Sequence, residues 1–256
     1  MVWKMVCLVF ALLLVCSLGQ AEDLPISKLV LFTAARRAEM EPVDPRIKPA
    51  VALSVDEGPS ADYTRQVLDI LDANGCHATF FMVGTAMDQN PELVKAVYES
   101  GNEVGLHTWR HNDLNSMDGN AIVHNLELCQ AIVLEQTGAT ARWLRPPYGR
   151  VGPAAYSACS ALGMYIATWT IDSRDWESQN AEKIYKEVIG QLQNGAIILF
   201  HDTHSATVEA LKTILPEIKA QGYQVLTVDQ LMSFRETLKS ATHYYHLDIG
   251  KLKSLE

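Results

Sequence analysis

From Ala50 onward, short apolar runs alternate with longer segments in which apolar residues recur at helical spacing. The apolar runs predict buried strands at residues 51–55, 78–83, 103–106, 142–144, 165–168, 196–200 and 224–227. The helical spacing predicts helices at residues 61–73, 91–99, 121–136, 153–162, 181–192 and 208–220, and a last helix that begins at Val228. Ser60 stands where the N-cap of the first of these helices is expected.

Strands that alternate with helices require a largely parallel sheet with right-handed crossovers. About seven such units favour a closed barrel over an open sheet. We therefore predict an α/β fold, a distorted (β/α) barrel of about seven parallel strands in a single domain. The chain has 256 residues, of which 48% are hydrophobic, and this is enough to bury such a core.

Both ends of the chain depart from this repeat, which spans residues 50–235. Lys4 precedes an apolar run, and small residues follow up to Ala21, which is the layout of a secretory signal peptide at residues 1–21. We therefore expect a secreted protein, extracellular or in the cell wall; the alternative is a protein tethered to the membrane by an uncleaved signal. Residues 22–49 form a polar extension. Residues 236–256 form a tail without a clear period, which either packs back or frays.

Charge and cysteine content narrow the class of partner and of site. The net charge of -9 argues against nucleic acid or an anionic membrane surface as the main partner. Outside the signal peptide, Cys76, Cys129 and Cys159 remain, at no metal-ligand spacing. We expect three buried core thiols rather than a disulfide scaffold, although one pair could form in an oxidising compartment.

Polar clusters follow the predicted strands at their C-terminal ends, which is the face where α/β barrels build active sites. The clusters are Asp56-Glu57, His107 with His111, Arg145-Pro146-Pro147-Tyr148-Gly149, Asp175-Trp176 and Leu199-Phe200-His201. Two imidazoles and a carboxylate are a standard zinc set with an open position for water. A second carboxylate and a distant histidine can supply the base and the acid of a hydrolysis.

Five motifs in order resemble those of the polysaccharide deacetylases with a NodB homology domain, a carbohydrate-esterase family that includes chitin and peptidoglycan N-acetylglucosamine deacetylases. The resemblance covers about residues 50–235. It rests on Leu53-Ser54-Val55-Asp56-Glu57-Gly58-Pro59-Ser60, His107-Thr108-Trp109-Arg110-His111, Arg145-Pro146-Pro147-Tyr148-Gly149, Asp172-Ser173-Arg174-Asp175-Trp176 and Leu199-Phe200-His201-Asp202. One such motif would be weak evidence, whereas five in the right order are specific.

The resemblance implies a metal and a base on one side of the site. His107 and His111 would bind one divalent metal, most often zinc, through neutral imidazoles. Asp56 would be the general base that takes a proton from water. Arg145 would keep that carboxylate ionised and oriented.

The resemblance also implies an acid and a pocket on the other side. His201 would protonate the leaving amine, with Asp175 as the carboxylate that keeps it charged. The backbone N–H of Tyr148 would stabilise the oxyanion. Trp176 and Leu199 would wall an apolar pocket for the acetyl methyl group, although plain core packing is an alternative for both.

Glu57 departs from the family pattern, which has a metal-binding aspartate at this position. Glutamate is a good zinc ligand chemically, but one more carbon–carbon bond adds roughly 1.5 Å of reach, and metal-ligand distances tolerate only about 0.2 Å. Glu57 is therefore a doubtful third ligand. Two hypotheses follow for an N-acetylated polysaccharide or oligosaccharide partner: metal-dependent removal of N-acetyl groups from N-acetylglucosamine polymers, or glycan or other extracellular binding by a catalytically silent homologue. A third, an O-acetyl esterase, stays open because the same site attacks esters.

Overall fold

The computed structural model describes residues 42–235 and 237–252. The expected signal peptide and most of the expected extension, residues 22–41, lie outside these residues. Pro42–Glu256 form one compact unit. The strands of this unit are β1 (Ala50–Glu57), β2 (Thr79–Met82), β3 (Glu103–Leu106), β4 (Trp143–Leu144), β5 (Tyr165–Ala167), β6 (Ile171–Asp172), β7 (Ile197–His201), β8 (Gln224–Leu226) and β9 (His243–Tyr244).

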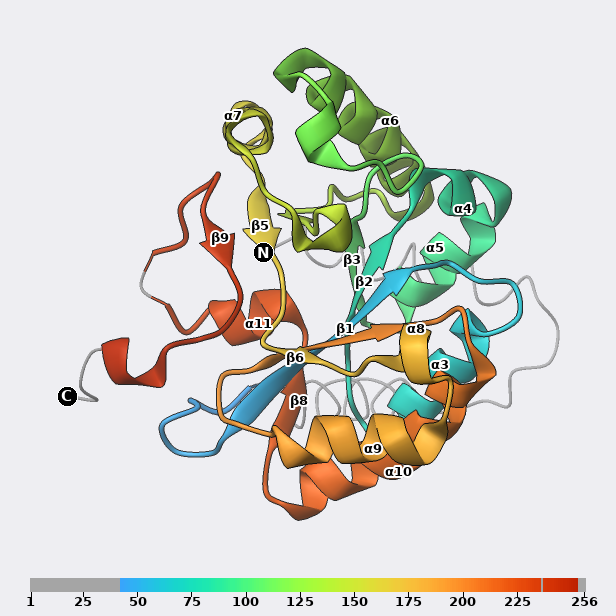
Figure 1. Cartoon of the computed structure of the whole chain (residues 1–256), viewed down its shortest axis with the longest axis vertical. Coiled ribbons are helices and arrows are strands. Elements are labelled where there is room, and N and C mark those ends of the chain that lie inside the picture. Colours follow the sequence, from blue (N-terminus) through green and yellow to red (C-terminus); the bar gives the residue numbers. More distant parts are fainter. Residues whose placement is uncertain (1–41, 236, 253–256) are drawn as a thin grey trace, which may run out of the picture. The chain divides into compact units, whose positions relative to one another are not determined.

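The nine strands of the described residues belong to one sheet, and every pairing between these strands is parallel. The order is β6-β7-β1-β2-β3-β4-β5-β9, with β8 beside the start of β1 (Figure 1). The predicted (β/α) barrel is confirmed. The sheet has two more strands than the apolar runs predict, because β6 and β9 are two residues long and too short to show a period.

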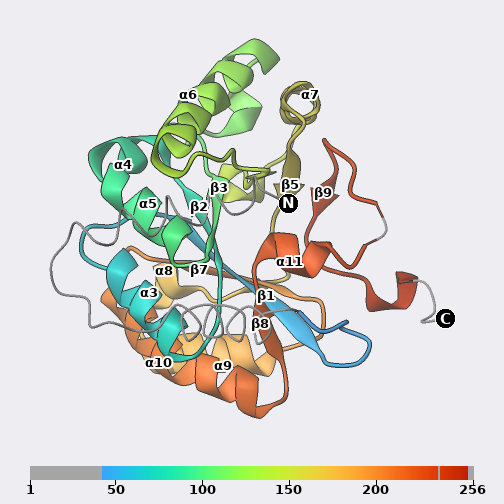
Figure 2. The same ribbon diagram turned by 180° about the vertical axis from the view of Figure 1, so that it is seen from behind.

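Helices cover the outside of this sheet in two groups, and the two views show α3, α9 and α10 together on one side and α4, α5, α6 and α7 on the other (Figures 1 and 2). The helices are α3 (Thr64–Ala73), α4 (Gly84–Gln89), α5 (Pro91–Glu99), α6 (Gly119–Thr137), α7 (Pro153–Leu162), α8 (Asp175–Ser178), α9 (Ala181–Gly190), α10 (Ser205–Ala220) and α11 (Val228–Met232). Short 3-10 turns are η1 (Leu114–Ser116), η2 (Pro147–Gly149) and η3 (Ile249–Lys251). Within the described residues, no helix is long and apolar enough to cross a bilayer.

The prediction that Ser60 caps the first helix is wrong. The helix α3 begins three residues later than expected, and its N-cap is Tyr63. Ser60 instead opens a separate turn, because its hydroxyl accepts the N–H of Tyr63 and its carbonyl accepts the N–H of Thr64. The residues between the strand and the helix therefore form a short fixed loop, and this loop follows the motif that carries Asp56.

Alternation along β1 separates the two sides of the barrel wall. Val51, Leu53 and Val55 pack outward with the helices in one apolar cluster. Ala50 and Ala52 face inward, in a second cluster with side chains from β2, β4, β5, β7, β8 and β9. The same alternation places Ser54 and Asp56 on the inner face, toward the C-terminal end of the strand. Small inward residues on β1 leave room for large groups from other strands.

The C-terminal segment completes the barrel. The strand β9 pairs with β5, and His246 forms an antiparallel bridge to Ala196 next to β7. Tyr244 and Leu247 are buried in the inner apolar cluster. Of the two alternatives for the tail, residues 243–247 pack back and join the two edges of the sheet.

Cys76, Cys129 and Cys159, the three cysteines among the described residues, are buried and form no disulfide, as expected.

Candidate active site

Residues from four motifs meet at the C-terminal ends of the central strands. Asp56 lies near the end of β1 and is the register partner of His201, the last residue of the adjacent strand β7. His107 directly follows β3, and Arg145 directly follows β4. The two strands are paired here, since the N–H of Arg145 donates to the carbonyl of Leu106. The sheet register therefore brings these side chains to one level of the barrel.

A fully buried arginine holds the carboxylate of Asp56. Nη1 of Arg145 lies 2.7 Å from Asp56 Oδ1 and donates to the hydroxyl of Ser54 at 2.7 Å. The other guanidinium nitrogens donate to the carbonyls of Ala167, at 3.3 Å, and Thr168, at 3.0 Å. The guanidinium also lies over the ring of Phe81, 4.1 Å from its centroid. These contacts fix the orientation of Arg145, and hence that of Asp56.

His107 is a neutral imidazole with one ring nitrogen free to act as a ligand. Its Nδ1 lies 2.7 Å from the carbonyl of Arg145, which can only accept, so Nδ1 carries the proton and Nε2 has a free lone pair. Burial lowers the pKa of His107 to about 4, against the opposing effect of Asp56. The imidazole is therefore uncharged at neutral pH, and Nε2 lies 3.8 Å from Asp56 Oδ2.

His111 and Glu57 lie beside this pair on strained loops. Nε2 of His111 is 3.8 Å from Glu57 Oε1, and the imidazole ring centroids of His107 and His111 are 4.9 Å apart. Both residues have a positive φ, 53° at His111 and 76° at Glu57, as do Thr108 and Tyr148. Non-glycine residues seldom adopt this conformation, and such strain concentrates at functional sites.

His201 and Asp175 form a buried dyad on the other side. His201 Nδ1 lies 2.7 Å from Asp175 Oδ1, and the other carboxylate oxygen accepts the backbone N–H of His201 and the hydroxyl of Thr207. Burial disfavours a charge on His201, but the hydrogen bond and charge of Asp175 outweigh it and raise the pKa of the imidazole to about 9. Burial also acts to raise the pKa of Asp175, yet its partners, His201 first, lower it. The dyad is thus an imidazolium with its carboxylate at neutral pH.

The three residues expected around the substrate have different settings. Tyr148 is 61% exposed at φ 60°, and its N–H is among the first of the turn η2, which have no acceptor within the turn. Trp176 is 53% exposed on α8. Leu199 is only 3% exposed and faces inward two residues before His201. Its side chain is therefore packed in the barrel interior and does not line an open pocket.

Three further residues complete the site, and sequence reasoning assigned none of them a role. Ser54 holds Arg145, and the alternation of β1 could have found it on the same face as Asp56. Trp169 lies 5.7 Å from the guanidinium of Arg145 and packs beside Gly149. Thr207 binds Asp175 from the first turn of α10. For these last two, no local pattern gives a signal.

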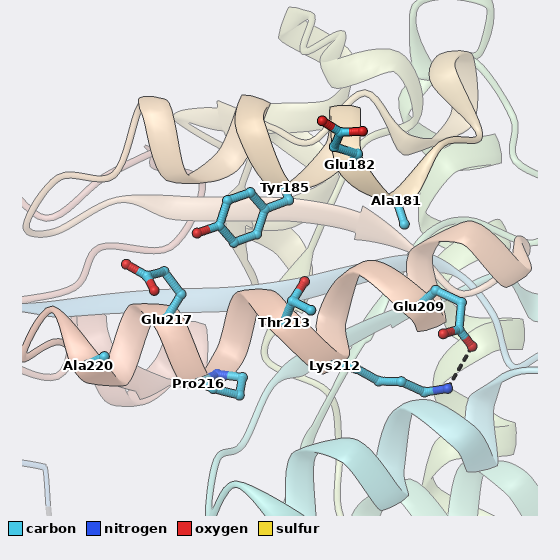
Figure 3. A pocket seen from close by; sticks show the side chains of 9 residues that line it. All are labelled: Ala181, Glu182, Tyr185, Glu209, Lys212, Thr213, Pro216, Glu217 and Ala220. Carbon is cyan, nitrogen blue, oxygen red and sulfur yellow. Dashed lines mark hydrogen bonds and ion pairs between the residues drawn. The ribbon is translucent and has the colours of Figure 1, made fainter.

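A separate groove of about 830 Å³ lies on the outer surface between α9 and α10 (Figure 3). It is lined by Ala181, Glu182, Tyr185, Glu209, Lys212, Thr213, Pro216, Glu217 and Ala220. None of the residues described above lines this groove. We therefore assign the candidate active site to the strand ends, where the side chains converge, and not to this groove.

Comparison with known proteins decides the family. Residues 44–189 match the family model for polysaccharide deacetylase. The chain belongs to the polysaccharide deacetylase family.

Two relatives place this chain within the family. It is 37% identical over 195 residues to the peptidoglycan-N-acetylglucosamine deacetylase PgdA of Listeria monocytogenes. That alignment covers 76% of this chain and 41% of PgdA, so the chain spans about two fifths of that relative. The solved T48 deacetylase with substrate is 30% identical, with a TM-score of 0.75 over 79% of this chain and all of the other.

A third relative is a solved structure from the same family. It is a mutant of BA3943, described as a pseudoenzyme of carbohydrate esterase family 4. This structure is 29% identical to the chain, with a TM-score of 0.69, and the match covers 72% of this chain and 67% of the other.

Polysaccharide deacetylases of this family generally use a divalent metal, and the donors of this chain fit one in part. The ligand types are suitable, and His107 has the tautomer that a metal requires. Within residues 42–235 and 237–252, however, no three His, Cys, Asp or Glu side chains are grouped so that they could hold an ion. Glu57 approaches His111, but the third point of the expected site is not formed.

Proposed function

We propose that this chain hydrolyses N-acetyl groups of N-acetylglucosamine units in a polysaccharide or its oligomers. The observation that carries the proposal is that an acidic and a basic side chain, each held by a partner of opposite charge, lie on neighbouring strands. Asp56 is held by Arg145, and His201 is held by Asp175. Because Asp56 and His201 are register partners, a bound amide would lie between a proton acceptor and a proton donor.

The chain's own residues account for the proton transfers. Water attacks the acetyl carbonyl carbon while Asp56 Oδ2, the oxygen not bound by Arg145, takes its proton. The carbonyl oxygen becomes negative and accepts a hydrogen bond from the N–H of Tyr148. The C–N bond then breaks as His201 Nε2 gives its proton to the leaving nitrogen, so that acetate and a free amine result. When bound, a divalent metal would polarise the water and the carbonyl.

The substrate class rests on the named activities of relatives. PgdA and a relative in Bacillus cereus are peptidoglycan-N-acetylglucosamine deacetylases, and a relative in Bradyrhizobium is a chitooligosaccharide deacetylase. The glycans they share are polymers or oligomers with N-acetylated amino sugars. We therefore propose such a glycan, of peptidoglycan or chitin type, as the partner of this chain.

A second candidate function is a catalytically silent homologue that binds glycans or another extracellular ligand. Two observations favour it: the described residues hold no three-point metal group, and a solved relative is a pseudoenzyme of the same family. In that case Glu57 would be the cause, because its longer side chain does not place the carboxylate where an aspartate would.

The substitution Glu57→Asp separates the two candidates. We expect it to raise zinc affinity more than about tenfold, because the carboxylate then matches the reach of the family's ligand. Hydrolysis of N-acetylglucosamine oligomers should rise with it, by about a hundredfold if a misplaced water limits the rate. Titration calorimetry and acetate release measure the two quantities.

The matched control is His107→Ala, which should abolish zinc binding in both backgrounds. Zinc affinity and activity that both fall in Glu57→Asp would show that glutamate is an adapted ligand. A native chain without zinc and without activity, combined with an active Glu57→Asp variant, would favour the silent homologue. Hydrolysis of acetylated xylan but not of the amide substrates would instead identify an esterase.

We also propose that the protein is exported, because residues 1–21 have the layout of a signal peptide. The expected outcome of expression in a secreting host is a mature chain that begins at Glu22 by N-terminal sequencing. Recovery of the full chain in the membrane fraction would contradict cleavage and support a tethered form.

A further inference from the structure

Asp202 is a fully buried carboxylate that the proposed chemistry does not use. It directly follows His201 at the end of β7 and is 0% exposed. The hydroxyl of Thr64 donates to its Oδ2. Its Oδ1 has no hydrogen-bond partner among the described residues. A buried carboxylate with an unpaired oxygen is costly, and its retention calls for a cause.

Both oxygens of this carboxylate face Gly58. A Cβ atom added to Gly58 would lie 2.5 Å from Oδ1 and 2.5 Å from Oδ2 of Asp202. Gly58 is not at a positive φ, so the close approach rather than the backbone conformation demands glycine here. Gly58 directly follows Asp56 and Glu57, and Asp202 therefore packs against the loop that carries the proposed base.

Thr64 joins the same two segments a second time. Its hydroxyl oxygen accepts the N–H of Ser60 at 2.7 Å and donates its proton to Asp202. The loop after β1 is thus tied to the end of β7 by a relay of two hydrogen bonds and by the contact at Gly58.

The loop then passes this constraint to its neighbours. The carbonyl of Gly58 accepts the N–H of Val83, the residue between β2 and α4, at 2.9 Å. Gly84 donates in turn to the carbonyl of Thr108 at 2.9 Å, and Thr85 donates to that of Trp109 at 2.9 Å. Thr108 and Trp109 lie between His107 and His111 in the sequence. A continuous series of contacts therefore runs from Asp202 to both proposed ligand histidines.

We propose that Asp202 is a positioning residue, which holds the loops bearing Asp56, Glu57, His107 and His111 in place relative to His201. Its role in turnover rests on the proposed function, whereas its role in loop placement does not. The close approach of both carboxylate oxygens to Gly58 is the contact through which Asp202 holds the first of these loops.

The test compares two valine substitutions, Thr64→Val and Thr79→Val. The two threonines are both 0% exposed, and each hydroxyl donates to a carboxylate and accepts a backbone N–H. Thr79 makes its bonds with Glu103 and Val228 at the start of β2, at the opposite end of the barrel. A general loss of buried hydrogen bonds is therefore the same in both variants, and only Thr64→Val cuts the relay to Asp202.

The first readout is the imidazole nitrogen–proton NMR spectrum of the full mature chain. We expect the signals of His107, His111 and His201 to move in Thr64→Val and to stay in Thr79→Val. With an active protein, kcat should fall about ten- to a hundredfold in Thr64→Val while KM changes less than about twofold, because geometry and not binding is disturbed. Equal shifts in both variants, or no shift in either, would overturn the proposal.

Substitutions of Asp202 itself give the second arm. Asp202→Asn keeps an acceptor for Thr64 and should retain the native imidazole signals, whereas Asp202→Ala should reproduce the Thr64→Val spectrum. Native signals in a folded Asp202→Ala variant would contradict the positioning role, and if that variant fails to fold the valine pair decides. If the wild-type chain hydrolyses no acetylated glycan, the proposed function fails while the NMR comparison still tests the role of Asp202.

Discussion

Replacing Arg145 with methionine should lower the free energy of unfolding by about 3–5 kcal/mol. The guanidinium is fully buried and is the partner of Asp56, and it also donates to Ser54 and to the carbonyls of Ala167 and Thr168. Methionine fills much of the volume but leaves a buried carboxylate and two carbonyl groups without donors. Urea unfolding followed by circular dichroism measures the change.

The same substitution at Arg174 is the control. Arg174 pairs with Glu177 on the surface, where both side chains are about half exposed, so its loss should leave the free energy of unfolding nearly unchanged. A loss below about 1 kcal/mol for Arg145→Met would mean that Asp56 is not held by a desolvated pair. Arg145→Lys is expected to fall between the two, since a single ammonium cannot reach all four acceptors.

Replacing His201 with glutamine should reduce deacetylation by about a hundred- to ten-thousandfold without loss of fold. Glutamine can occupy a similar volume, but it cannot carry the proton that the leaving nitrogen needs. Acetate release from N-acetylglucosamine oligomers measures the rate, and far-ultraviolet circular dichroism measures the fold. A variant with near-native activity would show that the leaving amine takes its proton from another group.

The pKa of His201 determines in which direction stability and activity change with pH. The pKa of His201 in the folded chain, about 9, lies above its ordinary value of 6.5 because of Asp175. While Asp175 is ionised, protonated His201 therefore contributes its full stabilisation of the fold below pH 6.5, and this contribution is lost as the pH rises through about 9. In Asp175→Asn the opposing effect of burial is no longer outweighed, so the pKa of His201 should fall and the alkaline limit of activity should move to lower pH.

Asp172→Asn is the control for this shift. Asp172 lies in the same motif, but its carboxylate accepts the backbone N–H of Arg174 and, within the described residues, forms no hydrogen bond with His201. The alkaline limb of the pH–rate profile should stay in place in that variant. An unchanged limb in Asp175→Asn would show that a group other than His201 sets it.

The barrel and its motif-bearing face follow from the sequence by itself. Buried strands and amphipathic helices have regular periods, and parallel strands joined by helices must all end on one face. The motifs at Asp56, His107, Arg145 and His201 therefore could be assigned to one site without coordinates. The alternation of β1 also follows from period two, and it places Ser54 beside Asp56.

Other features were decided only by the tertiary structure, because they depend on contacts between segments without a local signal. The strand β9 is two residues long and forms only against β5, so the tail from 236 showed no period. The start of α3 is set by Ser60 and Thr64, and the latter is bound by Asp202, 138 residues away. The need for glycine at position 58 arises from the same carboxylate.

Glu57 shows most clearly which features the sequence determines and which only the tertiary structure decides. The sequence identifies it as a departure from the family's aspartate and shows that its reach differs by one methylene. Where that carboxylate lies depends on the positive φ of Glu57 and on the loops packed around it, and the fold places it 3.8 Å from His111. Residue type is local information, whereas the meeting of three donors at one point requires several loops to be placed at once, and only the packed chain does that.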